Sequence, residues 1–84
     1  MFYIYIIYSN AVDKYYVGQT ENIEDRLVSH NSAISTYTSI TKDWILVYTE
    51  SFETRNEAIC RENDIKRKKS RRYIEWLISK GELN

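Results

Sequence analysis

The chain has 84 residues, of which 43% are hydrophobic and 29% are charged, with acidic and basic residues in equal number. This length suits one domain over residues 1–84 and leaves no room for a second, and the composition excludes an intrinsically disordered chain. The zero net charge argues against a nucleic-acid binder that relies on overall charge, so any such binding has to come from an uneven distribution of charge.

Two aromatic segments joined by a short connection predict a β-hairpin at the start of the chain. Residues 2–8 are apolar at both parities, which is typical of a strand that is covered on both faces. Residues 9–14 contain the turn formers Asn10 and Asp13, and residues 15–19 then form the returning strand. A connection this short favours antiparallel pairing of the two strands.

Alternation along these two strands groups their aromatic residues. Side chains two residues apart lie on the same face of a strand, so Tyr3 and Tyr5 share one face of the first strand. Tyr16 and Gly18 likewise share one face of the second strand. The register of the hairpin decides whether these two faces coincide, and the sequence leaves that register open.

A helix is predicted after the hairpin. Asn22 can cap this helix, which has Asp25 in its first turn and runs to about Asn31. The sequence allows two possible inward faces for this helix. One contains Ile23, Leu27 and Asn31, and the other contains Ile23, Arg26 and His30. The following residues, 31–41, are rich in serine and threonine and are expected to form a loop.

A third strand and a long helix are predicted next. Residues 44–50 are apolar, with the β-branched and aromatic side chains that favour a strand. Thr54 and Glu57 have the spacing of a capping box, in which each residue satisfies a backbone donor of the other. The pattern therefore predicts a helix that begins after Thr54 and runs to about Lys69.

A last helix completes the pattern. Ser70 can cap this helix, and Gly81 is expected to end it. The elements then follow in the order ββαβαα. This order predicts an α+β domain in which helices flank a small, three-stranded, mainly antiparallel sheet.

The charges are strongly uneven along the chain. Residues 61–72 hold seven cations and two carboxylates, a net charge of +5, whereas residues 1–60 carry a net charge of −4. A basic segment of this kind can neutralise phosphates and gives salt-dependent binding to nucleic acid. The alternative is a solvated helix end, where cations interact favourably with the helix dipole.

The cysteine content and the apolar segments predict a cytoplasmic protein. The single cysteine, Cys60, excludes an internal disulfide and a cysteine-based zinc site, which favours a reducing compartment. The apolar start of the chain lacks a basic leader, and no apolar run approaches the roughly 18 residues that span a membrane. We therefore expect no membrane partner.

Four segments in a fixed order carry a family resemblance. They are Tyr3-Ile4-Tyr5, Tyr16-Val17-Gly18, Arg26-Leu27-x-x-His30-Asn31, and the segment from Ala58 through Glu62 to Ile65-Lys66. Together they resemble the motifs of the GIY-YIG endonuclease superfamily, in particular its small stand-alone bacterial proteins, and are similar to the N-terminal nuclease domain of excinuclease C. The resemblance spans nearly the whole chain. Tyr3 stands where the first motif has glycine, and Val17 stands where the second has isoleucine.

The resemblance implies five catalytic residues, namely Tyr5, Tyr16, Arg26, His30 and Glu62. Glu62 is implied to hold a divalent cation, Mg²⁺ or Mn²⁺, and Arg26 to clamp the scissile phosphate. Tyr5 and Tyr16 are implied to lie beside that phosphate, with Tyr5 favoured as the base that activates water. His30 lies one helical turn after Arg26, and an imidazole that changes charge near neutral pH could accept a proton from tyrosine or water.

Four of these residues, Glu62, His30, Tyr5 and Tyr16, also have an ordinary structural interpretation. Glu62 can be a solvated glutamate on a helix surface, and His30 can be a cation that interacts with the dipole at a helix C-terminus. Tyr5 and Tyr16 can pack their rings in the sheet with hydroxyls in water, as most strand tyrosines do. Cys60 is expected to be a packing residue and not a reactive one.

A second set of residues is expected to bind nucleic acid. The set consists of Gly18, Lys66, Arg67, Lys69 and Arg71. The glycine lets the backbone approach closely at a strand edge, and the basic side chains contact phosphates. A chain this short has little room for an added recognition domain, so we expect DNA binding of low sequence specificity. A protein partner or a homodimer would then be needed to cut both strands.

Two functional hypotheses follow from these residues. The first is a metal-dependent endonuclease that hydrolyses DNA phosphodiester bonds, in repair or in other DNA processing. The second is a non-catalytic nucleic-acid-binding module that needs a partner. A structural or protein-interaction domain is a third interpretation, and such a domain would show no salt-dependent binding to nucleic acid.

Overall fold

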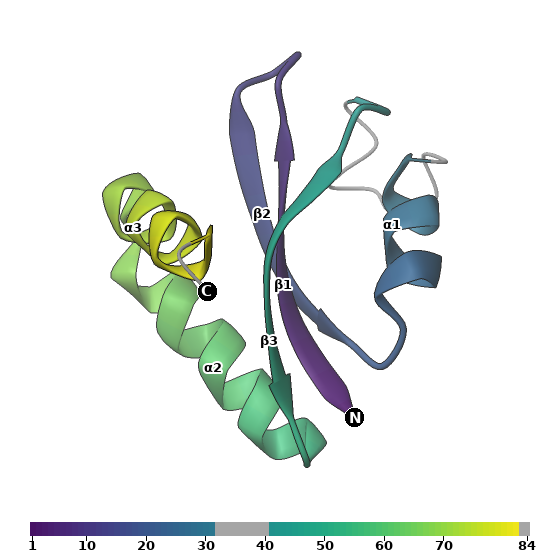
Figure 1. The fold of residues 1–84 in the computed structure, drawn as a ribbon, viewed down its shortest axis with the longest axis vertical. Coiled ribbons are helices and arrows are strands. Elements are labelled where there is room, and N and C mark those ends of the chain that lie inside the picture. Colours follow the sequence, from purple (N-terminus) through teal and green to yellow (C-terminus); the bar gives the residue numbers. More distant parts are fainter. Residues whose placement is uncertain (32–40, 83–84) are drawn as a thin grey trace.

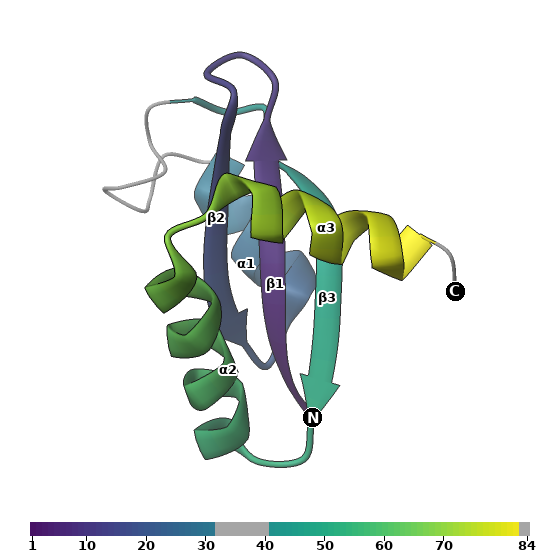
Figure 2. The same ribbon diagram turned by 90° about the vertical axis from the view of Figure 1, so that its left-hand side faces the viewer.

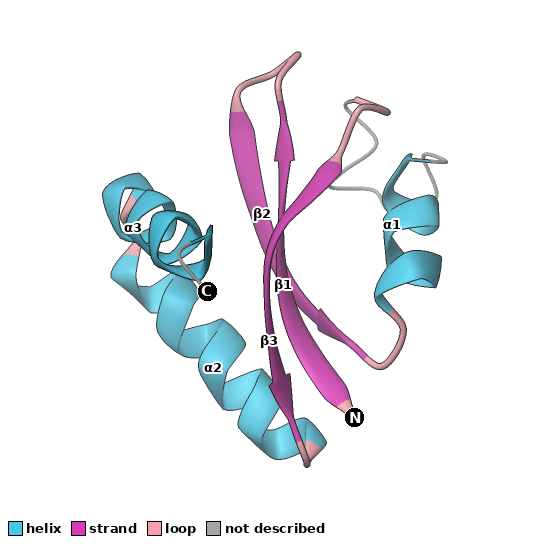
Figure 3. Ribbon diagram, viewed as in Figure 1, coloured by secondary structure: helices cyan, strands magenta, loops and turns pink. Residues whose placement is uncertain are grey.

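The computed structural model describes residues 1–31 and 41–82, which contain three strands and three helices. They are β1 (Phe2–Ser9), β2 (Lys14–Thr20), α1 (Ile23–Asn31), β3 (Ile45–Phe52), α2 (Arg55–Lys68) and α3 (Arg71–Glu82). This order confirms the predicted ββαβαα pattern and the α+β class (Figure 3). The predicted loop lies outside the described residues, apart from its two ends.

The sheet has the strand order β2-β1-β3, and both strand pairs are antiparallel. β1 is the central strand and is covered on both faces, which explains why its residues are apolar at both parities. α1 covers one face of the sheet, and α2 and α3 cover the other (Figure 1). α3 crosses the strands, while α2 lies beside β2 (Figure 2).

Each face of β1 has its own apolar cluster. The cluster under α2 and α3 consists of Ile4, Ile6, Val17, Ala58, Ile65 and Leu77. The cluster under α1 consists of Tyr5, Ile7 and Trp44, with Tyr16 and Leu27 packed against it. The site tyrosines therefore belong to the smaller cluster, between the sheet and α1.

The predicted caps fix where all three helices begin. The backbone N–H of Asp25 donates to Asn22 Oδ1 at 3.1 Å, so Asn22 caps α1. Thr54 and Glu57 form the full capping box at the start of α2. At the start of α3, the N–H of Tyr73 donates to Ser70 Oγ at 3.1 Å. These bonds satisfy backbone donors that a helix start leaves without intrahelical partners.

Some details of the predicted elements are wrong. β3 begins at Ile45 and not at Trp44, because Trp44 is instead a buried residue that the side chain of Asn31 holds through two hydrogen bonds to its backbone. α3 continues through Gly81 to Glu82. Cys60 is exposed on α2 and does not pack in the core. None of the described helices is long and apolar enough to cross a membrane.

Candidate active site

The hydroxyl of Tyr5 is the meeting point of the predicted site. Tyr5 lies in the middle of β1 and only 2% of it is exposed. Its hydroxyl oxygen is 2.8 Å from His30 Nε2 and accepts a hydrogen bond from Arg26 Nε at 3.3 Å. The structure thus brings together residues that are 21 and 25 positions apart in the sequence.

The hairpin register places the two site tyrosines on the same face of the sheet. Tyr5 pairs with Gly18, and Ile7 pairs with Tyr16. The sequence left this register open, and the observed register puts Tyr5 and Tyr16 on the same face. The ring centroids of Tyr5 and Tyr16 are 6.5 Å apart. The ring of His30 lies edge-on to Tyr16, with a centroid distance of 5.0 Å. The two phenols and the imidazole therefore form one aromatic group under α1.

Gly18 makes room for the ring of Tyr5. A Cβ atom at Gly18 would lie 2.6 Å from Tyr5 Cζ and 3.0 Å from Cε1, closer than side chains tolerate. Gly18 is also buried, so the structure places it beneath Tyr5 and not at an accessible strand edge. Its backbone φ is not positive, so the requirement for glycine here is one of space. The close approach predicted for Gly18 is thus made by a side chain of the protein itself.

Arg26 and His30 extend from one face of α1 towards the hydroxyl of Tyr5. The backbone N–H of Arg26 donates to the carbonyl of Asn22 at 3.1 Å, and Asn31 holds Trp44 at the other end of the helix. His30 is completely buried, while Arg26 is exposed. Of the two possible inward faces, the one that reaches Tyr5 therefore contains Arg26 and His30, and Leu27 packs against the same cluster.

Burial moves the pKa values of the phenol and the imidazole in opposite directions. Burial raises the pKa of Tyr5 to about 12, although the hydrogen bond and charge of Arg26 act in the other direction. Burial, together with the positive charge of Arg26, lowers the pKa of His30 to about 4. Both groups are therefore neutral at neutral pH in the free protein.

These pKa values and positions correct three expectations. His30 does not change charge near neutral pH in the free protein, because its pKa lies near 4. The alternative of a helix-end cation is also wrong, because the ring is buried and neutral. For Tyr5, the alternative of a hydroxyl in water is wrong, since His30 and Arg26 bind that hydroxyl inside the protein.

Glu62 approaches the site from the face of the sheet that lies opposite α1 (Figure 1). It lies on α2 with its side chain 18% exposed, and Lys66 Nζ is 2.6 Å from its Oε2 atom. The same ammonium lies 5.7 Å from the ring centroid of Tyr16. The negative charge of Glu62 contributes to the raised pKa of Tyr5, so the carboxylate lies within electrostatic reach of the phenol. The structure thus disagrees with a fully solvated Glu62.

The donor set at Glu62 suits a hard, largely hydrated cation. Within the described residues, no group of three or more histidine, cysteine, aspartate or glutamate side chains could form a closed metal cage. Mg²⁺ commonly uses only one or two protein carboxylates and takes its other ligands from water and substrate phosphate. One half-buried carboxylate fits that requirement, provided that Lys66 releases it.

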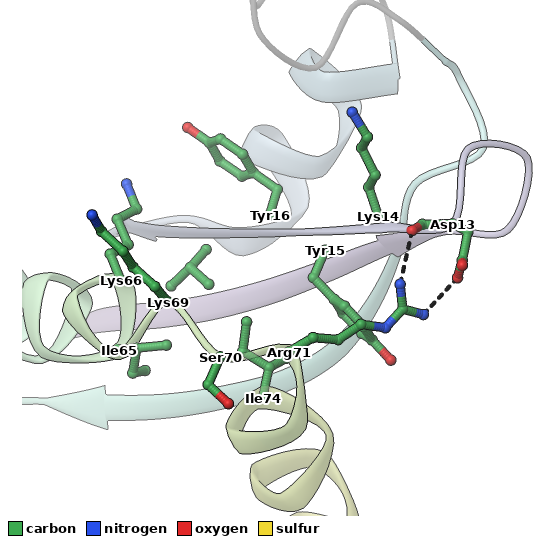
Figure 4. Close-up of a pocket in the computed structure, with 11 residues that line it drawn as sticks. Asp13, Lys14, Tyr15, Tyr16, Ile65, Lys66, Lys69, Ser70, Arg71 and Ile74 are labelled. Carbon is green, nitrogen blue, oxygen red and sulfur yellow. Dashed lines mark hydrogen bonds and ion pairs between the residues drawn. The ribbon is translucent and has the colours of Figure 1, made fainter.

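A groove passes over the outer edge of β2 beside Tyr16, and we call it the β2-edge groove (Figure 4). Its lining residues come from β2, the end of α2 and the start of α3. They are Asp13, Lys14, Tyr15, Tyr16, Val17, Ile65, Lys66, Lys69, Ser70, Arg71 and Ile74. Of the residues expected to bind nucleic acid, Lys66, Lys69 and Arg71 line this groove. Arg67 is exposed elsewhere on α2 and does not line it.

One further residue of the site, Lys14, and one further contact, between Asn31 and Trp44, had not been expected. Lys14 lines the β2-edge groove two positions before Tyr16, and this spacing alone could have placed both side chains on one face of β2. Asn31 fixes the end of α1 by bonding to the backbone of Trp44 at 3.0 and 2.8 Å. No sequence signal marks that contact, since the two residues are separated by the predicted loop.

Replacement of Gly18 by alanine is expected to destabilise the fold and displace Tyr5. The new Cβ meets a ring that His30 and Arg26 hold in place, so we expect a cost of roughly 1–3 kcal/mol in the free energy of unfolding. Urea unfolding measures this cost, and Gly81→Ala, at the chain's other glycine, is the control. Equal stability of Gly18→Ala and the wild type would contradict the close packing.

Stability is expected to fall as the pH drops below the ordinary pKa of histidine. Between about pH 6.5 and pH 4 the unfolded chain binds a proton at His30 that the folded chain excludes, so the stabilisation present above pH 6.5 is progressively lost. We expect a loss of roughly 2 kcal/mol between about pH 7 and pH 5. Urea midpoints measure it, and His30→Gln should flatten the dependence. The same slope in that variant would assign the effect to other groups.

Comparisons with known proteins identify the family of the chain. Residues 1–74 match the GIY-YIG catalytic domain. A UPF0213 protein of Staphylococcus saprophyticus is 38% identical over 80 residues, which cover 94% of this chain and 95% of that protein. UPF0213 proteins of Staphylococcus haemolyticus and Bacillus velezensis are 37% and 36% identical, over 76% and 88% of this chain and 78% and 76% of their own lengths. No solved structure matches significantly. The chain therefore belongs to the GIY-YIG family.

Proposed function

We propose that the protein is a metal-dependent endonuclease that hydrolyses DNA phosphodiester bonds, with repair or other DNA processing in the cytoplasm as its setting. The observation that carries this proposal is the convergence of a guanidinium at 3.3 Å and an imidazole at 2.8 Å on one buried phenol. Membership in the GIY-YIG family, which is defined by a catalytic domain, supports the same chemistry.

Arg26 is the group suited to bind the scissile phosphate. Its guanidinium is exposed, and its pKa is raised by the hydrogen bond to Tyr5, so it stays charged. A guanidinium can donate two parallel hydrogen bonds to phosphate oxygens. It then stabilises the extra negative charge that forms as water attacks the phosphorus. Its bond to Tyr5 orients the side chain for this contact.

Tyr5 and His30 are suited to remove the proton from the attacking water. The oxygen of water bonds to phosphorus as the bond from phosphorus to the leaving oxygen breaks, and the leaving oxygen keeps the bonding electron pair and takes a proton from solvent. The water proton moves to the oxygen of Tyr5, and the hydroxyl hydrogen of Tyr5 moves to Nε2 of His30. A bound phosphate places negative charge near the imidazole, which raises the pKa of His30 above its value in the free protein. Tyr16 borders both rings and orients them.

Glu62 is the residue that would hold Mg²⁺ or Mn²⁺. When bound, such a cation would neutralise phosphate charge and polarise the bond that breaks. The carboxylate oxygens are the hard ligands that these ions prefer. The short contact between Lys66 and Glu62 means that the cation has to compete with an ammonium for the same oxygen.

A specific observation also favours the second candidate, a nucleic-acid-binding module without activity of its own. Tyr5 is 2% exposed and His30 is completely buried, so neither group is accessible to a substrate in this state. As an enzyme, the protein has to open α1 or act through Arg26 and Tyr16 at the surface. We propose low sequence specificity in either case, with a second copy or a protein partner for cutting both strands.

Replacement of Glu62 by glutamine is expected to abolish cleavage and to leave DNA binding intact. The amide keeps the size of the carboxylate but loses the charge that holds the cation, so the cleavage rate should fall by at least roughly 100-fold. The measurement uses labelled duplex, nicked, flapped and single-stranded DNA with Mg²⁺ or Mn²⁺, and a chelator as a second control. Glu53→Gln, the same change at an exposed site, should cut like the wild type.

The outcomes of this experiment separate the two candidates. Cleavage that survives in Glu62→Gln would contradict the assignment of Glu62 as the metal ligand. Salt-dependent DNA binding with no cleavage by any protein, in the presence of either cation, would favour the binding module instead.

Replacement of Lys66 by methionine is expected to tighten the binding of Mn²⁺. The cation no longer has to displace an ammonium from Glu62, so we expect a dissociation constant about 3-fold lower. Electron paramagnetic resonance of free Mn²⁺ measures this constant without any turnover. Lys68→Met removes the same charge from the same helix end and is the control. Weaker binding in Lys66→Met than in Lys68→Met would show that Lys66 supports the site and does not compete for it.

A further inference from the structure

The β2-edge groove has the size and charge of a site for one nucleic-acid strand. Its volume is about 740 Å³, which lies in the range of sites that hold small ligands and is suited to a few nucleotides. Four cationic side chains and one carboxylate line it, namely Lys14, Lys66, Lys69, Arg71 and Asp13. The cations come from β2 on one wall and from α2 and α3 on the other (Figure 4). A polyanion along this edge would meet positive charge from both of these segments.

Two of these cations are available to phosphates. Arg71 is bound to Asp13 at 2.6 Å and to Glu75 at 3.3 Å, and Lys66 is bound to Glu62. Among the described residues, neither Lys14 nor Lys69 has an ion-pair partner. Figure 4 shows the side chains of Lys14 and Tyr16 leaving β2 on the same side, and Lys66 and Lys69 projecting in that direction too.

Backbone strain is concentrated at this groove. Among the described residues, only Asp13 and Lys69 have positive φ without being glycine, with φ values of 53° and 47°, and both line the groove. Lys69 is the left-handed residue that ends α2, a position where glycine is the usual residue. A residue other than glycine is strained in this conformation. Strain of this kind is commonly kept where a side chain serves a function.

The edge of β2 adds neutral donors. β2 is an outer strand that pairs only with β1 among the described strands, so half of its backbone groups have no partner in the sheet. Backbone N–H groups are frequent donors to phosphate oxygens. The groove therefore combines flexible cations with fixed donors along one line.

The groove also begins at the candidate active site. Tyr16 and Lys66 line its first part, and the ammonium of Lys66 lies over the ring of Tyr16. Lys14 and Tyr16 are two residues apart on β2, so a strand that leaves Tyr16 along this edge passes Lys14. Cations on both walls suit a single backbone, because a duplex presents only one side of itself to such a surface.

We propose that the β2-edge groove binds the single-stranded segment of nucleic acid that continues from the scissile phosphate, with Lys14 and Lys69 contacting its phosphates. This proposal rests on the nuclease function only for the position of the scissile phosphate. It makes Lys14 and Lys69 determinants of substrate structure: they favour DNA with a single-stranded overhang or flap over blunt duplex.

The test measures binding by fluorescence anisotropy in the presence of a chelator, so that no cleavage occurs. The probes are a blunt duplex and the same duplex with a short single-stranded overhang. We expect Lys14→Met and Lys69→Gly each to weaken binding of the overhang probe about 3- to 10-fold and to lower the salt dependence by about one phosphate contact. Binding of the blunt duplex should change by less than about 2-fold.

Lys69→Gly gives a second readout, which guards against a trivial loss of folding. Glycine relieves the left-handed strain at the end of α2, so the melting temperature should rise by about 4 °C while binding weakens. Lys42→Met, at an exposed lysine outside the groove, is the matched control for loss of one charge. It should bind both probes like the wild type.

Each outcome bears on the proposal. If the groove variants bind the overhang probe like the wild type, or if they lose affinity for both probes equally, the groove proposal is overturned. The same conclusion follows if the wild type binds neither probe. If the wild type cleaves DNA and the groove variants bind the overhang probe unchanged, the nuclease proposal is supported and the groove proposal is overturned. If the groove variants selectively lose binding of the overhang probe and no protein cleaves DNA, the groove proposal is supported and the nuclease proposal is overturned.

Discussion

The packing of one phenol against one glycine is the constraint on which the site depends. Tyr5 lies across Gly18, where the absence of a Cβ leaves space for its ring, and this pairing fixes the register of β1 and β2. A slip of one residue would move Tyr16 to the opposite face of β2. With the register fixed, both phenols lie on the face that α1 covers. The chemistry of the site and the alignment of the central strands thus have the same cause.

α1 completes the site because both its ends are tied to the rest of the fold. Asn22 caps its start, and Asn31 holds the backbone of Trp44 at its end. Between these anchors, Arg26 and His30 meet the same hydroxyl. The helix is short, and an isolated helix of this length is not stable in water, so its polar contacts with Tyr5 also contribute to holding it on the sheet. Opening the site therefore costs structural contacts.

Much of the fold could be predicted because its signals are local. The hairpin, the capping residues Asn22, Thr54 and Ser70, and the motif residues all follow from spacings of a few positions. The buried state of His30 could not be predicted, because it depends on how α1 packs against strands far away in the sequence. For the same reason, its pKa near 4 has no counterpart in the sequence. The exposure of Cys60 likewise depends on which face of α2 meets the sheet.

The burial that holds the site together also keeps Tyr5 and His30 uncharged in the free protein. A phenol with a pKa near 12 and an imidazole with a pKa near 4 are both uncharged at neutral pH. Negative charge from a phosphate stabilises the imidazolium, whereas it opposes the phenolate. In the proposed mechanism, substrate therefore favours proton transfer from water through Tyr5 to His30 and not the accumulation of a free phenolate. Arg26 opposes the charging of His30 in the free protein. In the proposed mechanism, a phosphate bound to the guanidinium would remove this opposition.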